Sequence, residues 1–320
     1  MRVVIVGAGA IGGVVGGRLA EAGTDVVLVA RGAHGTAIRE RGLTVVDPER
    51  EFTVPVSVFE RIAEVGFGTD DVVCLAVKSQ DTVAVLDELV AAGATAPVAC
   101  LQNGVENERA ALRRLPVVLG VCVMLPAAHL TPGRVEAYAW PIPGLFDIGR
   151  YPEGSHRSAD ALVGELNSAG FDARAVADVM RWKYTKLLMN LGNSVEAMCP
   201  ADRNAATLAA RAREEGRACL DAAGIAYATA EEERERRGDR LKVGVIDGQA
   251  RGGGSSWQSL ARGTGAIESD YLNGEIVLLG RLHGVPTPVN ELLARAARAA
   301  ALARTPPGTI PASELLTRLG

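Results

Sequence analysis

The sequence predicts an α/β protein, with a parallel-sheet domain followed by an all-α C-terminal domain. Three observations support this prediction. Short β-branched runs alternate with amphipathic helical segments over the first half of the chain, a glycine-rich turn directly follows the first run, and helical patterns replace strands from Arg181 onward. The length of 320 residues suits roughly two domains. We therefore expect one domain at 1–178 and another at 179–320.

Five apolar runs in the first half are expected to form the parallel sheet, at 2–7, 25–30, 71–77, 97–102 and 117–123. Helices are expected between them at 10–22, 80–92 and 105–114. The stretch 133–150 contains two prolines and is expected to form an interrupted hairpin. A helix at 156–169 and a last strand near 172–177 complete the predicted first domain.

The second half is expected to contain helices and no strands. The helical patterns cover 179–198, 202–224, 256–262, 268–283 and 288–303. The charged run "EEERERRGDR" at 231–240 is expected to be a solvated helix face or a loop.

The charge and hydropathy of the chain exclude several classes of partner. A net charge of -4 and a pI of about 5.7 provide no basic field for nucleic acid or an anionic membrane. No apolar run approaches the roughly 18 residues that span a bilayer. The first residues run straight into glycines without a small-residue cleavage site, so we expect a strand there and not a signal peptide.

The cysteines and histidines predict neither disulfides nor a metal site. The cysteines lie far apart without a C-x-x-C pair, at Cys74, Cys100, Cys122, Cys199 and Cys219. We expect buried free thiols in a reducing cytoplasm. The four histidines show no metal-ligand spacing, so no metal is expected.

The turn "GAGAIG" at 7–12 has the G-x-G-x-x-G spacing of a dinucleotide-binding loop. It follows a strand and opens a helix, as this loop does in Rossmann-type sheets. Gly7 permits the tight turn, and Gly9 lets the backbone approach a pyrophosphate at the helix N-terminus. We expect Gly7, Gly9, Ala10, Ile11 and Gly12 to bind the cofactor. The alternative is a glycine turn that only packs tightly.

The end of the second predicted strand indicates which dinucleotide is bound. NAD sites place an acidic residue there to bind the ribose 2′-hydroxyl, whereas this chain has Arg31 in "VLVARG". A guanidinium binds a 2′-phosphate through two hydrogen bonds. The sequence therefore predicts NADP(H). The alternative is that Arg31 is a solvated loop charge.

Two polar clusters follow the third and fourth predicted strands, "AVKSQD" with Lys78 and "LQNGVEN" with Gln102 and Asn103. Ligands of open α/β sheets bind outside the carboxyl ends of the strands. Lys78 and Gln102 are candidates for cofactor binding, and Asn103 is a candidate for both cofactor and substrate. The alternative for either cluster alone is that its residues are polar only because turns at strand ends are generally polar.

The stretch "RWKYTKLLMN" at 181–190 places Lys186 and Asn190 on one stripe of an otherwise apolar helix. A buried ammonium is costly unless something compensates it. Lys186 is therefore a candidate for a site in a cleft. The alternative is a lysine that reaches solvent from the helix flank.

These segments, together with "SSWQSL" and "IESDYLNGEIVLLGRLHGVPTPVN", occur in an order that resembles the ketopantoate reductase (2-dehydropantoate 2-reductase) family over nearly the whole chain. The resemblance implies a dinucleotide-binding Rossmann domain and an all-α substrate and dimerisation domain. It also implies NADPH-dependent reduction of a 2-oxo acid to a 2-hydroxy acid, here 2-dehydropantoate to pantoate, in pantothenate biosynthesis. A homodimer is expected only on the general frequency of symmetric dimers.

The resemblance also implies roles for single residues. Lys186 matches the lysine that polarises and protonates the carbonyl oxygen, and Glu268 matches the acid that holds the hydroxyl of the substrate. Asn190 and Ser256 match groups that orient the substrate. An ammonium near Glu268 would stay charged and stabilise the negative charge that develops on the oxygen. The alternatives are a surface carboxylate for Glu268 and a helix N-cap for Ser256.

The chain departs from the family on the substrate side. Gly253 lies where many relatives carry an asparagine, Ser259 replaces an acid, and Gly265 lies where arginine and threonine are common. The stretch 231–254 is longer than usual. Two alternatives to the main prediction follow: a reductase of the same family for another oxo acid or ketone, and a regulatory protein that binds NADPH without turnover.

Overall fold

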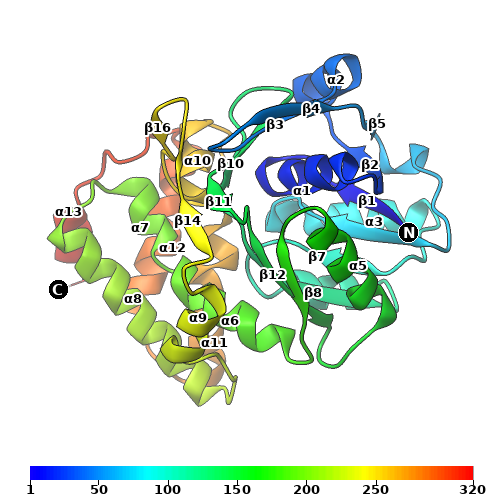
Figure 1. Cartoon of the computed structure of the whole chain (residues 1–320). Coiled ribbons are helices and arrows are strands. Elements are labelled where there is room, and N and C mark those ends of the chain that lie inside the picture. Colours follow the sequence, from blue (N-terminus) through cyan, green and yellow to red (C-terminus); the bar gives the residue numbers. More distant parts are fainter. Residues whose placement is uncertain (320) are drawn as a thin grey trace. The chain divides into compact units, whose positions relative to one another are not determined.

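The computed structural model describes residues 1–319, and the chain divides into two compact units (Figure 1). The first unit comprises Met1–Lys183 and Ala228–Arg251, and the second comprises Tyr184–Tyr227 and the chain from Gly252 onward. These compact units differ from the ranges 1–178 and 179–320 that the sequence suggests. The stretch 228–251, the returning segment, belongs to the first unit and not to the helical one.

An eight-stranded sheet forms the centre of the first unit, in the order β13-β12-β8-β7-β6-β1-β2-β5. All neighbouring strands run parallel except β8 and β12. The strands are β1 (Arg2–Val6), β2 (Asp25–Val29), β5 (Ser57–Phe59), β6 (Asp71–Leu75), β7 (Val98–Cys100), β8 (Val118–Met124), β12 (Leu145–Arg150) and β13 (Asp172–Ala175). All five predicted parallel strands are confirmed.

Helices cover both faces of this sheet because its strands are apolar on both faces. Along β1, Val3 and Ile5 enter one core, and Val4 and Val6 enter the other. The helices and 3-10 turns are α1 (Ala10–Glu21), α2 (Gly32–Arg41), η1 (Ile62–Glu64), η2 (Ser79–Asp81), α3 (Thr82–Ala91), α4 (Asn107–Leu112) and α5 (Arg157–Ser168).

A second sheet packs on α1, so that this helix has β-structure on two sides (Figure 1). Its order is β4-β3-β10-β9, and its strands are β3 (Leu43–Val46), β4 (Glu51–Val54), β9 (Ala127–Ala128) and β10 (Arg134–Ala137). Close packing explains two glycines of α1. A Cβ at Gly16 would lie 2.7 Å from Leu28, and one at Gly17 would lie 2.4 Å from Val45 of the second sheet.

The predicted hairpin at 133–150 is wrong. Its strands are β10, β11 (Ala139–Pro141) and β12, and each joins a different sheet. β10 pairs with β3 and β9, β11 pairs with β14, and β12 pairs with β8 and β13. The prolines interrupt the chain between sheets, which a local hydrophobic pattern does not distinguish from an interrupted hairpin.

The returning segment contains α9 (Ala230–Arg237) and three short strands, β14 (Leu241–Val243), β15 (Val245–Ile246) and β16 (Gln249–Ala250). The prediction of an entirely helical second half is wrong here, because β14 finds its partner in β11, a hundred residues earlier in the sequence. The charged run is helical up to Arg237 and is not wholly solvated. Arg236 is buried and donates from Nε to Asp147 at 2.8 Å.

The second unit is built from helices. They are α6 (Val179–Asn190), which begins in the first unit, α7 (Asn193–Met198), α8 (Arg203–Ala222), α10 (Ser255–Ala261), the 3-10 turn η3 (Glu268–Tyr271), α11 (Asn273–His283), α12 (Pro288–Leu302) and α13 (Ala312–Thr317). The helix expected at 179–198 is thus two helices, separated at 191–192.

A buried amide network holds these helices together. Asn273 donates to the carbonyl of Leu191 at 3.0 Å and to Asn290 at 2.9 Å. It also accepts from Ser194 at 2.7 Å. Elsewhere, the five cysteines are buried free thiols, as expected. Within residues 1–319, no helix has the length and apolar character needed to cross a membrane.

Candidate active site

The glycine loop lies between β1 and α1, directly before the N-terminus of this helix. Gly7 has a φ of +100°, which favours glycine, and a Cβ at Gly12 would lie 2.1 Å from the Gly7 carbonyl oxygen. Close contacts within the chain therefore explain the glycines at positions 7 and 12. Gly9 differs, because a Cβ there would meet no described atom within 4 Å apart from its chain neighbours. Its missing side chain leaves open space at the N-terminus of α1, the part of a helix at which backbone N–H groups can bind an anion.

Arg31 follows β2 and caps α2, at the strand end where the sequence placed it. Its Nη2 contacts both carboxylate oxygens of Glu88 on α3, at 3.0 and 2.9 Å. Both side chains are exposed, at 64% and 42%. An exposed pair of this kind contributes little stability, so the guanidinium can exchange Glu88 for another anion.

The loops that carry Lys78 and Asn103 lie together at the carboxyl ends of the adjacent strands β6 and β7. Asn107 joins them: its Nδ2 donates to the Asn103 carbonyl at 2.9 Å, and its Oδ1 accepts from Thr82 at 2.8 Å. The amide of Gln102 donates to the same threonine at 2.6 Å. Gln102 is therefore a buried member of the framework that supports Asn103.

A buried ion pair that the sequence pattern does not predict lies beside this framework. Lys183 of α6 bonds to Glu108 of α4, and its Nζ also donates to the Gln102 carbonyl at 3.1 Å. The two side chains are 3% and 0% exposed. Burial raises the pKa of Glu108, and the neighbouring Lys183 ammonium opposes that rise. The only sequence feature that suggests a buried lysine here is its place beside Trp182 and Tyr184 in "RWKYTK". Nothing in this stretch identifies Glu108 as its partner.

Lys186 and Asn190 lie one turn apart on α6, in the second unit, and both are half-buried. The Nδ2 atom of Asn190 is buried and has no hydrogen-bond partner among residues 1–319. A buried amide donor without a partner is costly, so this atom is suited to a ligand acceptor.

Ser256 is buried in the first turn of α10. Gly254 is the N-cap of this helix, so the alternative reading of Ser256 as the N-cap is wrong. The loop before it is shaped by Trp257, because a Cβ at Gly253 would lie 2.5 Å from the indole. The indole therefore fills the space that a side chain at residue 253 would need. The Gly254 N–H donates to Glu196 at 3.1 Å.

Glu268 begins η3 and is 5% exposed, so the alternative reading as a surface carboxylate is wrong. Burial lowers the pKa of Arg262, and the charge of Glu268 partly offsets that effect. Arg262 is thus a cation near Glu268 that no sequence motif indicates. Asn273 follows η3 and bonds to Leu191, the residue after Asn190. The segments that carry Glu268 and Asn190 are therefore tied to one another.

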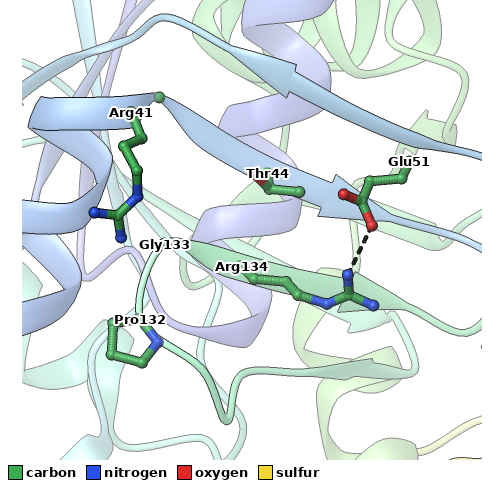
Figure 2. Close-up of a pocket in the computed structure, with 7 residues that line it drawn as sticks. Arg41, Thr44, Glu51, Pro132, Gly133 and Arg134 are labelled. Carbon is green, nitrogen blue, oxygen red and sulfur yellow. Dashed lines mark hydrogen bonds and ion pairs between the residues drawn. The ribbon is translucent and has the colours of Figure 1, made fainter.

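The candidates divide between the two units. All cofactor candidates lie in the first, and Lys186, Asn190, Ser256 and Glu268 lie in the second. A cavity of about 150 Å³ in the first unit includes none of them (Figure 2). It is lined by Arg41 and Arg134 among others, and Arg134 is bonded to Glu51 at 2.7 Å. Its volume lies below the roughly 300–1,000 Å³ of most ligand sites.

Both units match one family of proteins. Residues 3–153 match "Ketopantoate reductase PanE/ApbA", and residues 178–301 match "Ketopantoate reductase PanE/ApbA C terminal". A 2-dehydropantoate 2-reductase of Mesorhizobium japonicum is 31% identical, over 95% of this chain and 99% of the relative. A 2-dehydropantoate 2-reductase of Pyrococcus abyssi is 28% identical, over 92% of this chain and 95% of the relative.

Solved structures show the same fold. A PanE/ApbA family ketopantoate reductase from Ralstonia eutropha JMP134 has a TM-score of 0.79 and 29% identity, over 95% of this chain and 99% of that one. D-mandelate dehydrogenase, solved with NADH and anilino(oxo)acetate, has the same TM-score at 21% identity, over the same shares of the two chains. The chain belongs to the ketopantoate reductase family, and with it to the oxidoreductases that act on CH–OH groups.

Proposed function

We propose that the protein uses NADPH to reduce a 2-oxo acid to a 2-hydroxy acid, with 2-dehydropantoate as the leading substrate and pantoate as the product. The observation that carries this proposal is the buried carboxylate of Glu268, on a segment tied through Asn273 to the end of the helix with Lys186 and Asn190. A buried carboxylate is retained where it has a cation or a hydroxyl to hold.

In this proposal Lys186 and Glu268 act on the carbonyl oxygen, and Asn190 and Ser256 orient the substrate. The nicotinamide ring supplies the hydride to the carbonyl carbon when it is bound. Lys186 stabilises the negative charge that develops on the oxygen and donates the proton that completes the hydroxyl. Glu268 accepts a hydrogen bond from that hydroxyl. The Asn190 amide and the Ser256 hydroxyl donate to substrate oxygens and orient it.

NADPH is proposed over NADH because of Arg31. The guanidinium stands where NAD-binding loops have an acidic residue that would repel a 2′-phosphate, and its present partner Glu88 is exposed and exchangeable. The solved D-mandelate dehydrogenase has NADH bound. The choice of cofactor therefore needs its own measurement within this fold.

A second candidate substrate, another 2-oxo acid, is favoured by one observation. The indole of Trp257 occupies the space over Gly253, next to the helix that carries Ser256, so the substrate side differs in shape from relatives with a side chain there. Under this alternative the residue roles stay the same.

The test is a panel of 2-oxo acids, from 2-dehydropantoate to bulkier aliphatic and aromatic acids, assayed by loss of NADPH absorbance. The highest kcat/KM with 2-dehydropantoate supports the proposal, and a clear preference for another acid selects the second candidate. Binding of NADPH without turnover of any acid would indicate the regulatory protein. Two further proposals accompany the main one: a cytoplasmic location, which suits five buried free thiols, and a homodimer, which gel filtration with light scattering tests.

A further inference from the structure

His34, at the start of α2, connects two loops of the first unit through both nitrogens of its ring. Its Nε2 lies 2.7 Å from the carbonyl oxygen of Ala8. Its Nδ1 accepts from the Gly133 N–H at 2.9 Å. Ala8 belongs to the glycine loop, and Gly133 directly precedes β10. The histidine therefore ties the glycine loop to the second sheet.

These two partners determine the protonation of the ring. A backbone N–H can only donate and a carbonyl can only accept, so Nδ1 carries no proton and Nε2 carries one. Burial lowers the pKa of His34, which agrees with a neutral ring. The ring of His129 lies against it, with centroids 4.0 Å apart, and a charged His34 would also face that second imidazole.

The carbonyl that His34 holds belongs to the same peptide as the Gly9 N–H. Because a peptide is planar and trans, its C=O and N–H point in opposite directions. Gly9 is the N-cap of α1, and an N–H at this position has no carbonyl partner within the helix. A hydrogen bond that holds the Ala8 carbonyl toward His34 therefore also fixes the direction of the Gly9 N–H.

We propose that His34 is a positioning residue of the glycine loop, which holds the Ala8–Gly9 peptide so that its N–H points toward the pyrophosphate of the dinucleotide. This inference rests on the proposed function, because it takes the loop to bind a dinucleotide. Without the histidine, the peptide next to a glycine gains rotational freedom. Ligands with a pyrophosphate then bind more weakly, and ligands without one are unaffected.

The experiment measures binding by isothermal titration calorimetry for the wild type, His34→Ala, His34→Gln and the control His283→Ala. His283 is exposed and lies on α11 of the second unit. For His34→Ala we expect Kd for NADPH to rise about tenfold, as for one lost hydrogen bond. The Kd for adenosine 2′-monophosphate, which has no pyrophosphate, should change less than about twofold. The glutamine amide presents one donor and one acceptor, so His34→Gln should restore NADPH binding to within about threefold.

Three results would overturn the inference: unchanged NADPH binding by His34→Ala, an equal loss for adenosine 2′-monophosphate, or no rescue by glutamine. If His34→Ala does not fold, His34→Leu replaces it, because leucine fills part of the space of the ring but has no donor for the Ala8 carbonyl. Its Kd for NADPH should rise about tenfold, and NADPH binding equal to that of the wild type would refute the role. A wild type that binds NADPH but reduces no oxo acid refutes the proposed function and leaves the His34 test intact.

Discussion

The ammonium of Lys183 and the carboxylate of Glu108 form an ion pair that is closed to solvent, with the Gln102 carbonyl as a second acceptor. Lys183 is also the last residue of the first unit before the chain enters the second within α6. Lys186 follows it by three residues on the same helix. The pair therefore fixes the start of the helix that carries the proposed proton donor.

Replacing Lys183 by methionine should destabilise the protein by about 3 kcal/mol, because it leaves the Glu108 carboxylate buried without its cation. Urea unfolding followed by circular dichroism measures this change. The matched control is Lys242→Met, since Lys242 is exposed on β14. The double variant Lys183→Met with Glu108→Leu should regain part of the loss. If it is as unstable as the sum of its single variants, the pair is not energetically coupled.

Sequence reasoning predicted the parts of the fold that depend on local pattern. The buried strands β1, β2, β6, β7 and β8 were found because their residues are apolar and β-branched. β4 and β5 were missed because they are short and largely exposed or half-buried. The hairpin prediction failed because strand partners are not encoded locally.

The candidate site was predictable to the same extent. The sequence placed the clusters with Lys78 and Asn103 at the carboxyl ends of strands, and the pairing of β6 with β7 brings them together. Long-range charge pairs were not predictable: Glu108 lies 75 residues from Lys183, and Asp147 lies 89 residues from Arg236. Arg236 sits in a run of charges that looks solvated, and only its distant partner explains its burial.

Arg31→Ala should raise KM for NADPH at least tenfold and leave KM for NADH nearly unchanged, because only NADPH has the 2′-phosphate. Steady-state kinetics with both cofactors measure the two values. Glu88→Gln is an informative companion: it removes the charge that holds Arg31, so the KM for NADPH should fall or stay constant. Equal effects of Arg31→Ala on the two cofactors would refute the 2′-phosphate role.

Lys186→Ala should lower kcat by about a hundredfold or more, since both the charge and the proton donor are lost at the carbonyl oxygen. Its affinity for NADPH, measured by titration, should remain close to that of the wild type. Lys242→Ala again serves as a control and should retain full turnover. If Lys186→Ala retains wild-type kcat, another group must donate the proton, and the role proposed for Lys186 is wrong.

The lowered pKa of His34 should make the free energy of unfolding depend on pH. Its pKa is lowered in the folded state, so between the folded value and the unfolded value of about 6.5 the unfolded chain binds more protons. The stabilisation is present in full above about pH 6.5 and is lost as the pH falls toward the folded pKa. Urea unfolding from about pH 8 to about pH 5 should show a steeper loss for the wild type than for His34→Gln. Identical slopes would mean that His34 titrates normally in the folded protein.

The returning segment should depend on Arg236 for its attachment. The guanidinium is 4% exposed and donates to Asp147 at 2.8 Å, to a carboxylate oxygen of Asp172 at 3.1 Å and to the Asp172 carbonyl at 3.0 Å. Arg236→Met removes all of these bonds and leaves Asp147 with Arg174 alone. We expect residues 238–251 to open locally more often in this variant than in the wild type. Where cleavage follows the population of the open form, trypsin or chymotrypsin should cut this stretch at least about tenfold faster than in the wild type.

Arg240→Met provides the control for this experiment. Arg240 bonds to the same Asp172 at 2.9 Å, but its side chain is 51% exposed, so its loss should change the cleavage rate by less than about threefold. Mass spectrometry of the first fragments locates the cut. The chain re-enters the second unit at Gly252, immediately before Gly253, whose missing side chain leaves room for the Trp257 indole. Opening of the returning segment should therefore also raise KM for the oxo acid, while KM for NADPH stays unchanged. Early cleavage elsewhere in the chain would contradict this prediction, because it would show that Arg236 stabilises the first unit as a whole.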